Sequence, residues 1–237
     1  MRLLVTRPEP DGERTAKILR AQGHEVMLAP MLRIEAIPNA TFGAGPWAAV
    51  LMTSANGPRM MAQHPRLREL LSLPVLTVGR SSAEVARVAG FTNVESADGD
   101  GEDLVRLVAV RFTGATKPLL YPAGEDRARN LFGDLAQHGI SVETAVVYRA
   151  AKVTRLPPEV QTALQAGRID GVIHFSQRSV ETYLECTQSF HQAAVAPVHY
   201  CLSGRAARPL LSGGAKEVMV APNPEESALL ALVTPRP

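Results

Sequence analysis

The sequence contains little cysteine and no long apolar run. Its 237 residues include two cysteines, Cys186 and Cys201, and neither a CxxC nor an HExxH pattern occurs. Two cysteines are too few for a disulfide framework or a typical metal site, so we expect reduced thiols and no metal. The N-terminal apolar run is shorter than a signal peptide requires, and no stretch approaches the roughly 18 apolar residues of a membrane span. We therefore expect a cytoplasmic protein without a membrane partner.

An excess of charge of one sign is also missing. The 25 basic residues are nearly balanced by 23 acidic residues, and no block of five or six like charges occurs. Proteins that bind duplexes carry a basic patch, so we expect no nucleic acid partner. Of the basic residues, 21 are Arg and four are Lys. This bias suits recognition of carboxylates or phosphates, because a guanidinium offers a bidentate fork, but a GC-rich genome would produce the same bias.

What the chain does contain is a repeated alternation of strand and helix patterns. An apolar strand at 3–5, a helix that ends at Gly23 and a strand at 24–28 form one βαβ unit. The same alternation predicts parallel sheets covered by helices, an α/β fold. The further predicted strands are 48–52, 75–78, 119–121, 141–149, 171–175, 198–202 and 218–220, and the further helices are 54–64, 81–89, 102–111, 128–138, 157–166, 179–185, 204–211 and 225–233.

Two stretches of the chain resemble one another at an offset of about 122 to 125 residues. Residues 50–54 and 172–176 both lead into a helix, and residues 76–83 and 200–207 do the same. Such a duplication predicts two α/β domains, one formed by 38–147 and a discontinuous one formed by 1–34 plus 153–237. The connecting segments 33–37 and 146–153 are expected to pair as a two-stranded ladder, with a ligand cleft between the domains.

Small or hydroxyl residues follow six of the predicted strands, and four of these junctions carry an arginine. In open parallel sheets, ligands bind beyond the carboxyl ends of the strands, where helix N-termini present N–H groups and partial positive charge. Taken singly, each hydroxyl is explained as a helix N-cap, but together they predict anion sites for a ligand with several carboxylates or phosphates. The junctions are Thr6-Arg7, Thr53-Ser54, Gly79-Arg80-Ser81-Ser82, Pro122-Ala123-Gly124, Ser176-Gln177-Arg178 and Ser203-Gly204-Arg205.

The motifs of common cofactors and nucleophiles are absent. Neither a P-loop nor GxSxG occurs, and the six histidines have no ligand spacing. His174, on a predicted buried strand, is more typical of a hydrogen-bonded core residue than of a catalyst. Tyr148, on the predicted connection 146–153, remains the candidate catalytic residue, because a phenol facing a cleft could protonate a leaving group. The alternative is an aromatic side chain that packs one domain against the other.

Six short strings are spaced along nearly the whole chain: Leu4-Val5-Thr6-Arg7-Pro8, Gly23-His24-Glu25-Val26, Thr53-Ser54-Ala55-Asn56-Gly57, Val78-Gly79-Arg80, Leu120-Tyr121-Pro122-Ala123-Gly124 and Val146-Val147-Tyr148-Arg149. In this order the strings resemble the uroporphyrinogen-III synthase family. The resemblance implies two flavodoxin-like, three-layer α/β domains joined by a β-ladder. It also implies a cofactor-free reaction, in which hydroxymethylbilane loses its hydroxyl as water, ring D is inverted and the macrocycle closes as uroporphyrinogen III.

The resemblance implies roles for particular residues. Tyr148 matches the tyrosine thought to assist departure of the hydroxyl, while Thr53, Ser54, Ser82 and Ser176 match hydroxyls that line the family's cleft. The substrate carries eight carboxylates, which would occupy the predicted anion sites. The expected substrate-binding residues are Thr6, Arg7, Thr53, Ser54, Ala55, Arg80, Ser81, Ser82, Ala123, Gly124, Ser176, Gln177, Arg178, Gly204 and Arg205.

One departure from the family pattern occurs in the last of these helices. Where the family commonly has a threonine pair, this chain has Arg205-Ala206-Ala207 after Gly204. We therefore expect Arg205 to contact a substrate carboxylate instead.

Other functions remain open at this point. They are a two-domain small-anion binding protein, a flavodoxin-like or response-regulator-like module, and a family member that has lost activity. An exported binding protein would need a signal sequence. We expect a monomer without cofactor, and transient contact with neighbouring pathway enzymes is open.

Overall fold

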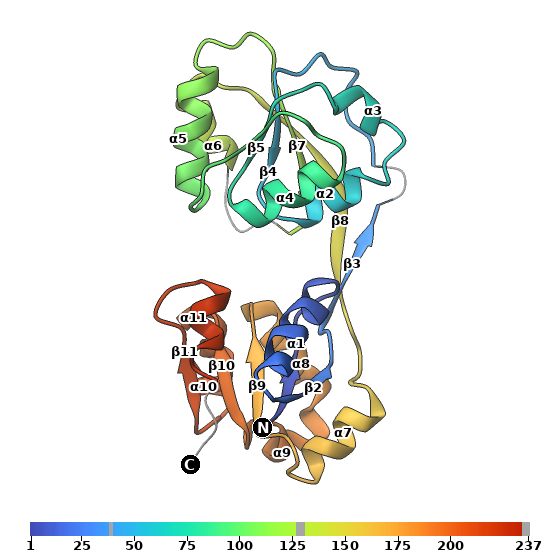
Figure 1. The fold of residues 1–237 in the computed structure, drawn as a ribbon, viewed down its shortest axis with the longest axis vertical. Coiled ribbons are helices and arrows are strands. Elements are labelled where there is room, and N and C mark those ends of the chain that lie inside the picture. The colour runs from blue at the N-terminus through green and yellow to red at the C-terminus, as the bar shows by residue number, and fades with distance from the viewer. Residues whose placement is uncertain (38–39, 127–130, 234–237) are drawn as a thin grey trace. The chain divides into compact units, whose positions relative to one another are not determined.

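The computed structural model describes residues 1–37, 40–126 and 131–233, and the chain divides into two compact units. Unit 1 comprises Met1–Arg33 and Ala151–Pro237, and unit 2 comprises Ile34–Ala150. Each unit has a sheet of mostly parallel strands accompanied by helices (Figure 1). The predicted α/β fold class is therefore confirmed. Among the described residues, no helix is long and apolar enough to span a membrane.

Unit 1 contains a five-stranded parallel sheet. Its strands, in spatial order, are β11 (Val218–Val220), β10 (Val198–Cys201), β9 (Gly171–His174), β1 (Arg2–Val5) and β2 (Glu25–Leu28). Its helices are α1 (Asp11–Ala21), α7 (Pro158–Gln165), α8 (Gln177–Cys186), the 3₁₀ helix η1 (Gln188–Phe190), α9 (His191–Val195), α10 (Gly204–Ser212) and α11 (Glu226–Leu230). Leu4 belongs to one buried cluster, while Leu3 and Val5 belong to another. Alternate residues of β1 thus supply cores on opposite faces, as expected for a strand covered on both sides.

Unit 2 contains a six-stranded sheet. Its strands, in spatial order, are β3 (Leu32–Ala36), β8 (Val142–Lys152), β7 (Leu119–Gly124), β4 (Val50–Met52), β5 (Val75–Thr77) and β6 (Val94–Ser96). Its helices are α2 (Asn56–Met61), α3 (Leu67–Leu70), α4 (Arg80–Val88), α5 (Gly101–Phe112) and α6 (Leu131–Ala136). Leu51 packs in one buried cluster and Val50 and Met52 pack in another, so this sheet also has two apolar faces.

Five strands of each sheet occupy corresponding places, but they follow one another in a different order along the chain. Strands β6-β5-β4-β7-β8 of unit 2 correspond in place to β11-β10-β9-β1-β2 of unit 1. In the internal sequence repeat, β4 matches β9 and β5 matches β10. The first two strands of the chain take the places that β7 and β8 hold at the end of unit 2. The two units are therefore related by a circular permutation, and unit 1 has the flavodoxin order 2-1-3-4-5.

Strand β3 lies beside β8 at one edge of the six-stranded sheet. The Ile37 N–H donates to the Val147 carbonyl at 2.9 Å, and the Val153 N–H donates to the Met31 carbonyl at 3.1 Å. The number of the partner falls as the residue number rises, which is the pattern of an antiparallel pair. The Arg149 guanidinium also forms an ion pair with Glu35 at 3.0 Å.

The structure contains several elements that the sequence patterns did not predict. They are β6, α3, η1 and α9. Strand β6 has the sequence Val-Glu-Ser, whose single apolar residue is too weak a signal. The predicted helix 128–138 is observed as α6 from Leu131 to Ala136, and residues 128–130 lie outside the described part of the chain.

Candidate active site

Tyr148 is placed by an irregularity between β7 and β8. The register of the two strands shifts between Ala123 and Gly124, which brings Gly124 opposite Tyr148. The Glu125 N–H donates to the Tyr148 carbonyl at 2.9 Å. A Cβ atom on Gly124 would lie 2.7 Å from Cε2 of the Tyr148 ring, so this approach requires glycine. The bulge and the glycine together determine the direction of the phenol.

Two tyrosines are each held by a hydroxyl from the end of β4. Ser54 Oγ lies 2.9 Å from the Tyr148 hydroxyl, and Thr53 Oγ1 lies 2.8 Å from the Tyr121 hydroxyl. Thr53 and Ser54 are consecutive residues directly after the strand. Either atom of each pair can be the donor, so each phenol retains the ability to donate a proton elsewhere.

A pocket of about 470 Å³ opens beside these hydroxyls within unit 2. Its lining combines four hydroxyl-bearing side chains with glycines, two apolar residues and two aspartates. The lining residues are Thr53, Ser54, Val78, Gly99, Asp100, Gly101, Tyr121, Gly124, Asp126, Leu131 and Tyr148. A concave pocket with a few convergent polar groups is typical of a small-molecule site.

The α5 N-terminus at this pocket carries negative charge. Asp100 is the N-cap, and its Oδ1 accepts hydrogen bonds from the N–H groups of Glu102 and Asp103 at 2.7 and 3.2 Å. Asp103 accepts from the Asp100 N–H in return, which completes a capping box. Hydrogen bonds from this N–H and from Arg106 hold the pKa of Asp103 below its usual range. This helix end therefore does not favour a carboxylate ligand.

Comparison with known proteins identifies the family. Residues 13–231 match the family model described as uroporphyrinogen-III synthase HemD. The chain belongs to the uroporphyrinogen-III synthase family. This confirms the resemblance inferred from the sequence, and it implies a lyase-type enzyme with a polypyrrole substrate.

Two of the solved structures of similar fold are a uroporphyrinogen-III synthetase and a uroporphyrinogen III synthase. The uroporphyrinogen-III synthetase of Helicobacter pylori is 20% identical, with a TM-score of 0.67 and 98% of each chain covered. A mutant uroporphyrinogen III synthase of Thermus thermophilus is 17% identical, with a TM-score of 0.52, over 98% of this chain and 96% of the other. At these identities the likeness concerns the fold. No curated protein sequence matches the chain.

Four of the site residues predicted from the sequence meet in the unit 2 pocket: Thr53, Ser54, Gly124 and Tyr148. The other predicted residues of unit 2, which are Ala55, Arg80, Ser81, Ser82 and Ala123, do not line it. Ala123 is buried in β7, and Ser82 is buried in the first turn of α4. Sequence reasoning missed Tyr121 and Asp126. The sequence placed Tyr121 on a buried strand. Asp126 was not expected at the site, because a substrate with many carboxylates predicts basic residues there.

In unit 1, two hydroxyls at strand ends act as helix N-caps. Ser176 Oγ accepts from the Ser179 N–H at 3.2 Å at the start of α8. Ser203 Oγ accepts from the Ala206 N–H at 3.3 Å at the start of α10. Gln177, Arg178 and Gly204 lie in the first turns of these two helices. The N-cap explanation therefore holds at both junctions, and contact with substrate there stays a prediction.

Thr6 is enclosed in the core of unit 1 and not exposed at the strand end. Its Oγ1 donates to the Ile173 carbonyl at 2.8 Å and lies 3.2 Å from His174 Nδ1. His174 Nε2 lies 3.1 Å from His199 Nδ1. Thr6, His174 and His199 are completely buried, so the structure offers no support for a substrate contact by Thr6. His174 is the hydrogen-bonded core residue that its position predicted.

Burial also determines the protonation of this histidine pair. Desolvation, followed by the proximity of His199, lowers the pKa of His174 well below its ordinary value. Desolvation lowers the pKa of His199 to about 4. Both rings are therefore neutral near pH 7, and each can donate one hydrogen bond and accept another.

The arginines at strand ends differ in how far their charge is balanced. Arg7 forms an ion pair with Glu226 at 3.1 Å and lies over the Phe175 ring. Arg80 forms an ion pair with Asp98 at 2.9 Å. Arg205 Nε donates to the neutral Gln177 amide at 3.0 Å. Of these three guanidinium groups, that of Arg205 is the best suited to a substrate carboxylate.

Within the described part of the chain, no group of three His, Cys, Asp or Glu side chains is placed to hold a metal.

Proposed function

We propose that this protein is a cytoplasmic, monomeric uroporphyrinogen-III synthase, a cyclising hydro-lyase that converts hydroxymethylbilane into uroporphyrinogen III without a cofactor. Family membership over residues 13–231 supports the reaction class. The observation that carries the proposal is the Tyr148 phenol, which lies at a pocket with its hydroxyl 2.9 Å from Ser54 Oγ.

In the proposed reaction Tyr148 acts as the general acid. The C–O bond of the hydroxymethyl group breaks, and its electron pair leaves with the oxygen. That oxygen takes the Tyr148 proton and departs as water. Ser54 donates to the phenolic oxygen, which directs the phenol proton towards the leaving group and stabilises the phenolate that remains. The phenolate recovers a proton when the closed macrocycle regains its aromatic rings.

The rest of the substrate is proposed to be held through its carboxylates. The guanidinium groups of Arg7, Arg80, Arg178 and Arg205 and the polar groups beside them would bind acetate and propionate chains. The dehydrated bilane can close unaided on its unrearranged ring D to give the type I isomer. The enzyme must therefore orient the chain so that the substituted position of ring D attacks first.

The product isomer tests the proposal. Purified protein is supplied with hydroxymethylbilane, the products are oxidised, and the type I and type III porphyrins are separated. We expect type III to predominate. A product mixture identical to that of the enzyme-free reaction would show that the protein is not a synthase.

Tyr148→Phe tests the assigned acid. It removes the acidic proton and keeps the ring, so we expect kcat to fall by roughly 10² to 10⁴, the usual contribution of a general acid, with little change in KM. Circular dichroism should show an unchanged fold. A wild-type kcat in this variant would show that Tyr148 is not the general acid.

A further inference from the structure

The internal repeat places Ser54 of unit 2 and Ser176 of unit 1 at corresponding positions, after β4 and β9 respectively. Ser176 Oγ accepts from the Ser179 N–H and caps α8. The N-cap of α2, by contrast, is Ala55, whose methyl side chain cannot accept a hydrogen bond. The Ser54 hydroxyl lies 2.9 Å from the Tyr148 hydroxyl. The same position of the fold therefore stabilises a helix in unit 1 and holds the phenol in unit 2.

The turn that carries Ser54 is restrained by a second hydroxyl pair. Alanine is a weak N-cap, so the turn 53–55 gains little from the start of α2. Thr53 Oγ1, however, lies 2.8 Å from the hydroxyl of Tyr121, which belongs to the neighbouring strand β7. Because threonine is stiff about χ1 and the peptide bond is planar, this contact also restrains the backbone that leads to Ser54. Tyr121 is only 5% exposed, so it is better placed to hold Thr53 than to reach substrate.

Unit 1 shows that the fold does not require this second pair. Strands β9 and β1 pair in unit 1 as β4 and β7 do in unit 2. Their registers, taken with the offset of the repeat, match Thr53 with Phe175 and Tyr121 with Val5. Neither of these apolar side chains can form a hydrogen bond. The pair of hydroxyls thus occurs in the unit that holds Tyr148, as a role in the reaction requires.

We propose that Tyr121 is a positioning residue, whose bond to Thr53 fixes the turn after β4 and keeps the Ser54 hydroxyl on the Tyr148 phenol. This inference rests on the proposed function, in which Tyr148 gives its proton to the departing hydroxyl. No bond is made or broken at Tyr121. Orientation of a general acid lowers the barrier of the chemical step and leaves substrate binding unaffected, so the effect of Tyr121 belongs to kcat and not to KM.

Tyr121→Phe and Thr53→Val remove the same contact from its two ends. We expect each to lower kcat by roughly threefold to tenfold, the factor that corresponds to the net free energy of one hydrogen bond, and to leave KM unchanged. Thr53→Ser keeps the hydroxyl and should recover most of the kcat that Thr53→Val loses. A loss in Tyr121→Phe without a loss in Thr53→Val would contradict the proposal, because Tyr121 would then act through another group.

Ser54→Ala tests whether the two hydroxyl pairs act in series. It removes the contact that Tyr121 is proposed to maintain, so Tyr121→Phe added to Ser54→Ala should lower kcat no further. If the two losses multiply instead, Tyr121 acts independently of Ser54 and the proposal is wrong.

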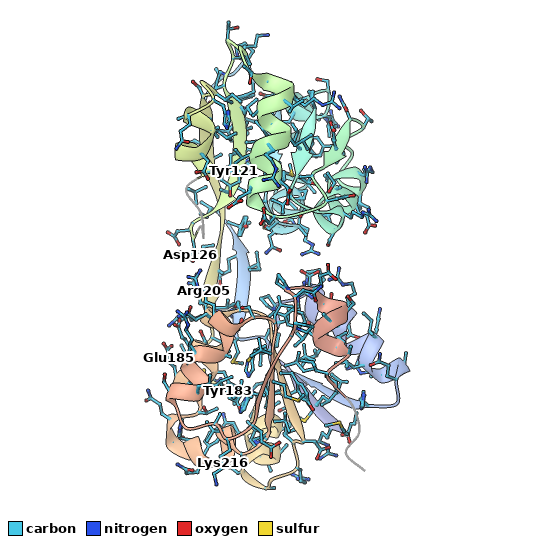
Figure 2. The ribbon with its side chains drawn as sticks, turned by 90° about the vertical axis from the view of Figure 1, so that its left-hand side faces the viewer. Tyr121, Asp126, Tyr183, Glu185, Arg205 and Lys216 are labelled. Atoms are coloured by element: carbon cyan, nitrogen blue, oxygen red, sulfur yellow. The ribbon has the colours of Figure 1, made fainter. Side chains whose placement is uncertain are left out.

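Tyr183→Phe is the matched control for stability. Figure 2 shows Tyr121 and Tyr183 in different units. The Tyr183 hydroxyl donates to the Ala194 carbonyl at 2.8 Å, and its ring is buried like that of Tyr121. Both substitutions remove a phenolic hydrogen bond from a buried ring, so both should lower the urea midpoint of unfolding. Tyr121→Phe alone should lower kcat. An equal loss of kcat in Tyr183→Phe would overturn the proposal, because the effect would then be one of stability.

The remaining outcomes separate this inference from the proposed function. If the wild-type protein makes the type III isomer and Tyr121→Phe lowers kcat by less than roughly threefold, the role of Tyr121 is wrong and the synthase assignment stands. A rise in KM at unchanged kcat would also overturn the inference, since Tyr121 would then contact substrate directly. If the wild-type protein makes no type III isomer, both proposals fail.

Discussion

At the scale of single residues, the orientation of the Tyr148 phenol depends on the absence of a side chain at Gly124. Gly124 lies against the Tyr148 ring, and the register shift beside it turns the phenol to Ser54. Sequence reasoning named Tyr148, Ser54 and Gly124 separately. Their contact could not be predicted, because it depends on pairing between β7 and β8 and on a bulge that has no local signature.

Gly124→Ala should lower both activity and stability. The added Cβ would overlap the Tyr148 ring at 2.7 Å, so the ring must move and the bond to Ser54 is lost. Overpacking of this kind costs typically 1–3 kcal/mol of unfolding free energy. Urea unfolding and kcat would be measured together. In a Tyr148→Ala background the same substitution should cost little, and an undiminished cost there would show that the ring is not the cause.

At the scale of elements, helix capping explains two of the six junctions that first indicated anion binding. Ser176 caps α8 and Ser203 caps α10. Capping and ligand binding favour the same residue types at the same positions, because both use the N–H groups exposed at a helix start. The sequence predicted the start of α10 at Gly204 and placed the start of α8 two residues late, at 179 in place of Gln177, but it could not separate the two uses.

Substitution of Ser176 can separate them. Ser176→Ala removes the cap and should lower the unfolding free energy by about 1 kcal/mol. Ser176→Asp keeps a capping oxygen and stability, but it places a negative charge where a substrate carboxylate is predicted to bind. If Ser176 contacts substrate, KM of Ser176→Asp should rise roughly tenfold, the effect of 1.4 kcal/mol of repulsion. An unchanged KM would show that Ser176 acts only as a helix cap.

At the scale of the whole molecule, the two units have separate cores, and we expect them to respond differently to pH. The completely buried histidines His174 and His199 lie in unit 1, as does the buried His24, whereas the single tryptophan, Trp47, is buried in unit 2. Trp47 Nε1 donates to Glu143 at 2.8 Å. Tryptophan fluorescence therefore reports on unit 2, and circular dichroism reports on both units.

Acid should destabilise unit 1 first. Burial lowers the folded-state pKa of both histidines below 6.5, to about 4 for His199, while the unfolded chain takes up protons from about pH 6.5. Stability is thus complete above pH 6.5 and falls as the pH drops towards 4, by up to about 1.4 kcal/mol per pH unit for each histidine. Between pH 7.5 and 5.0, the urea midpoint from circular dichroism should fall while that of Trp47 fluorescence stays constant.

A matched variant checks the origin of this slope. His199→Gln removes one of the two completely buried histidines, while His174 and the buried His24 still titrate, and it should make the pH dependence of unit 1 shallower. If the dichroism midpoint does not move between these pH values, the histidines are not titrating as their burial predicts. If the fluorescence midpoint moves equally, the two units do not unfold separately.

The sequence by itself determined the α/β class, the positions of most strands and helices and the family, and it named Tyr148 as the candidate catalytic residue. These features depend on apolar periodicity, glycine stops and short strings, which are local in the chain. Only the tertiary structure decided that Thr6 is buried against His174, that Tyr121 shares the pocket of Tyr148 and that Asp126 lines it. Those outcomes depend on pairing between residues far apart in sequence, such as Leu4 with Val172, and no local pattern encodes such pairing.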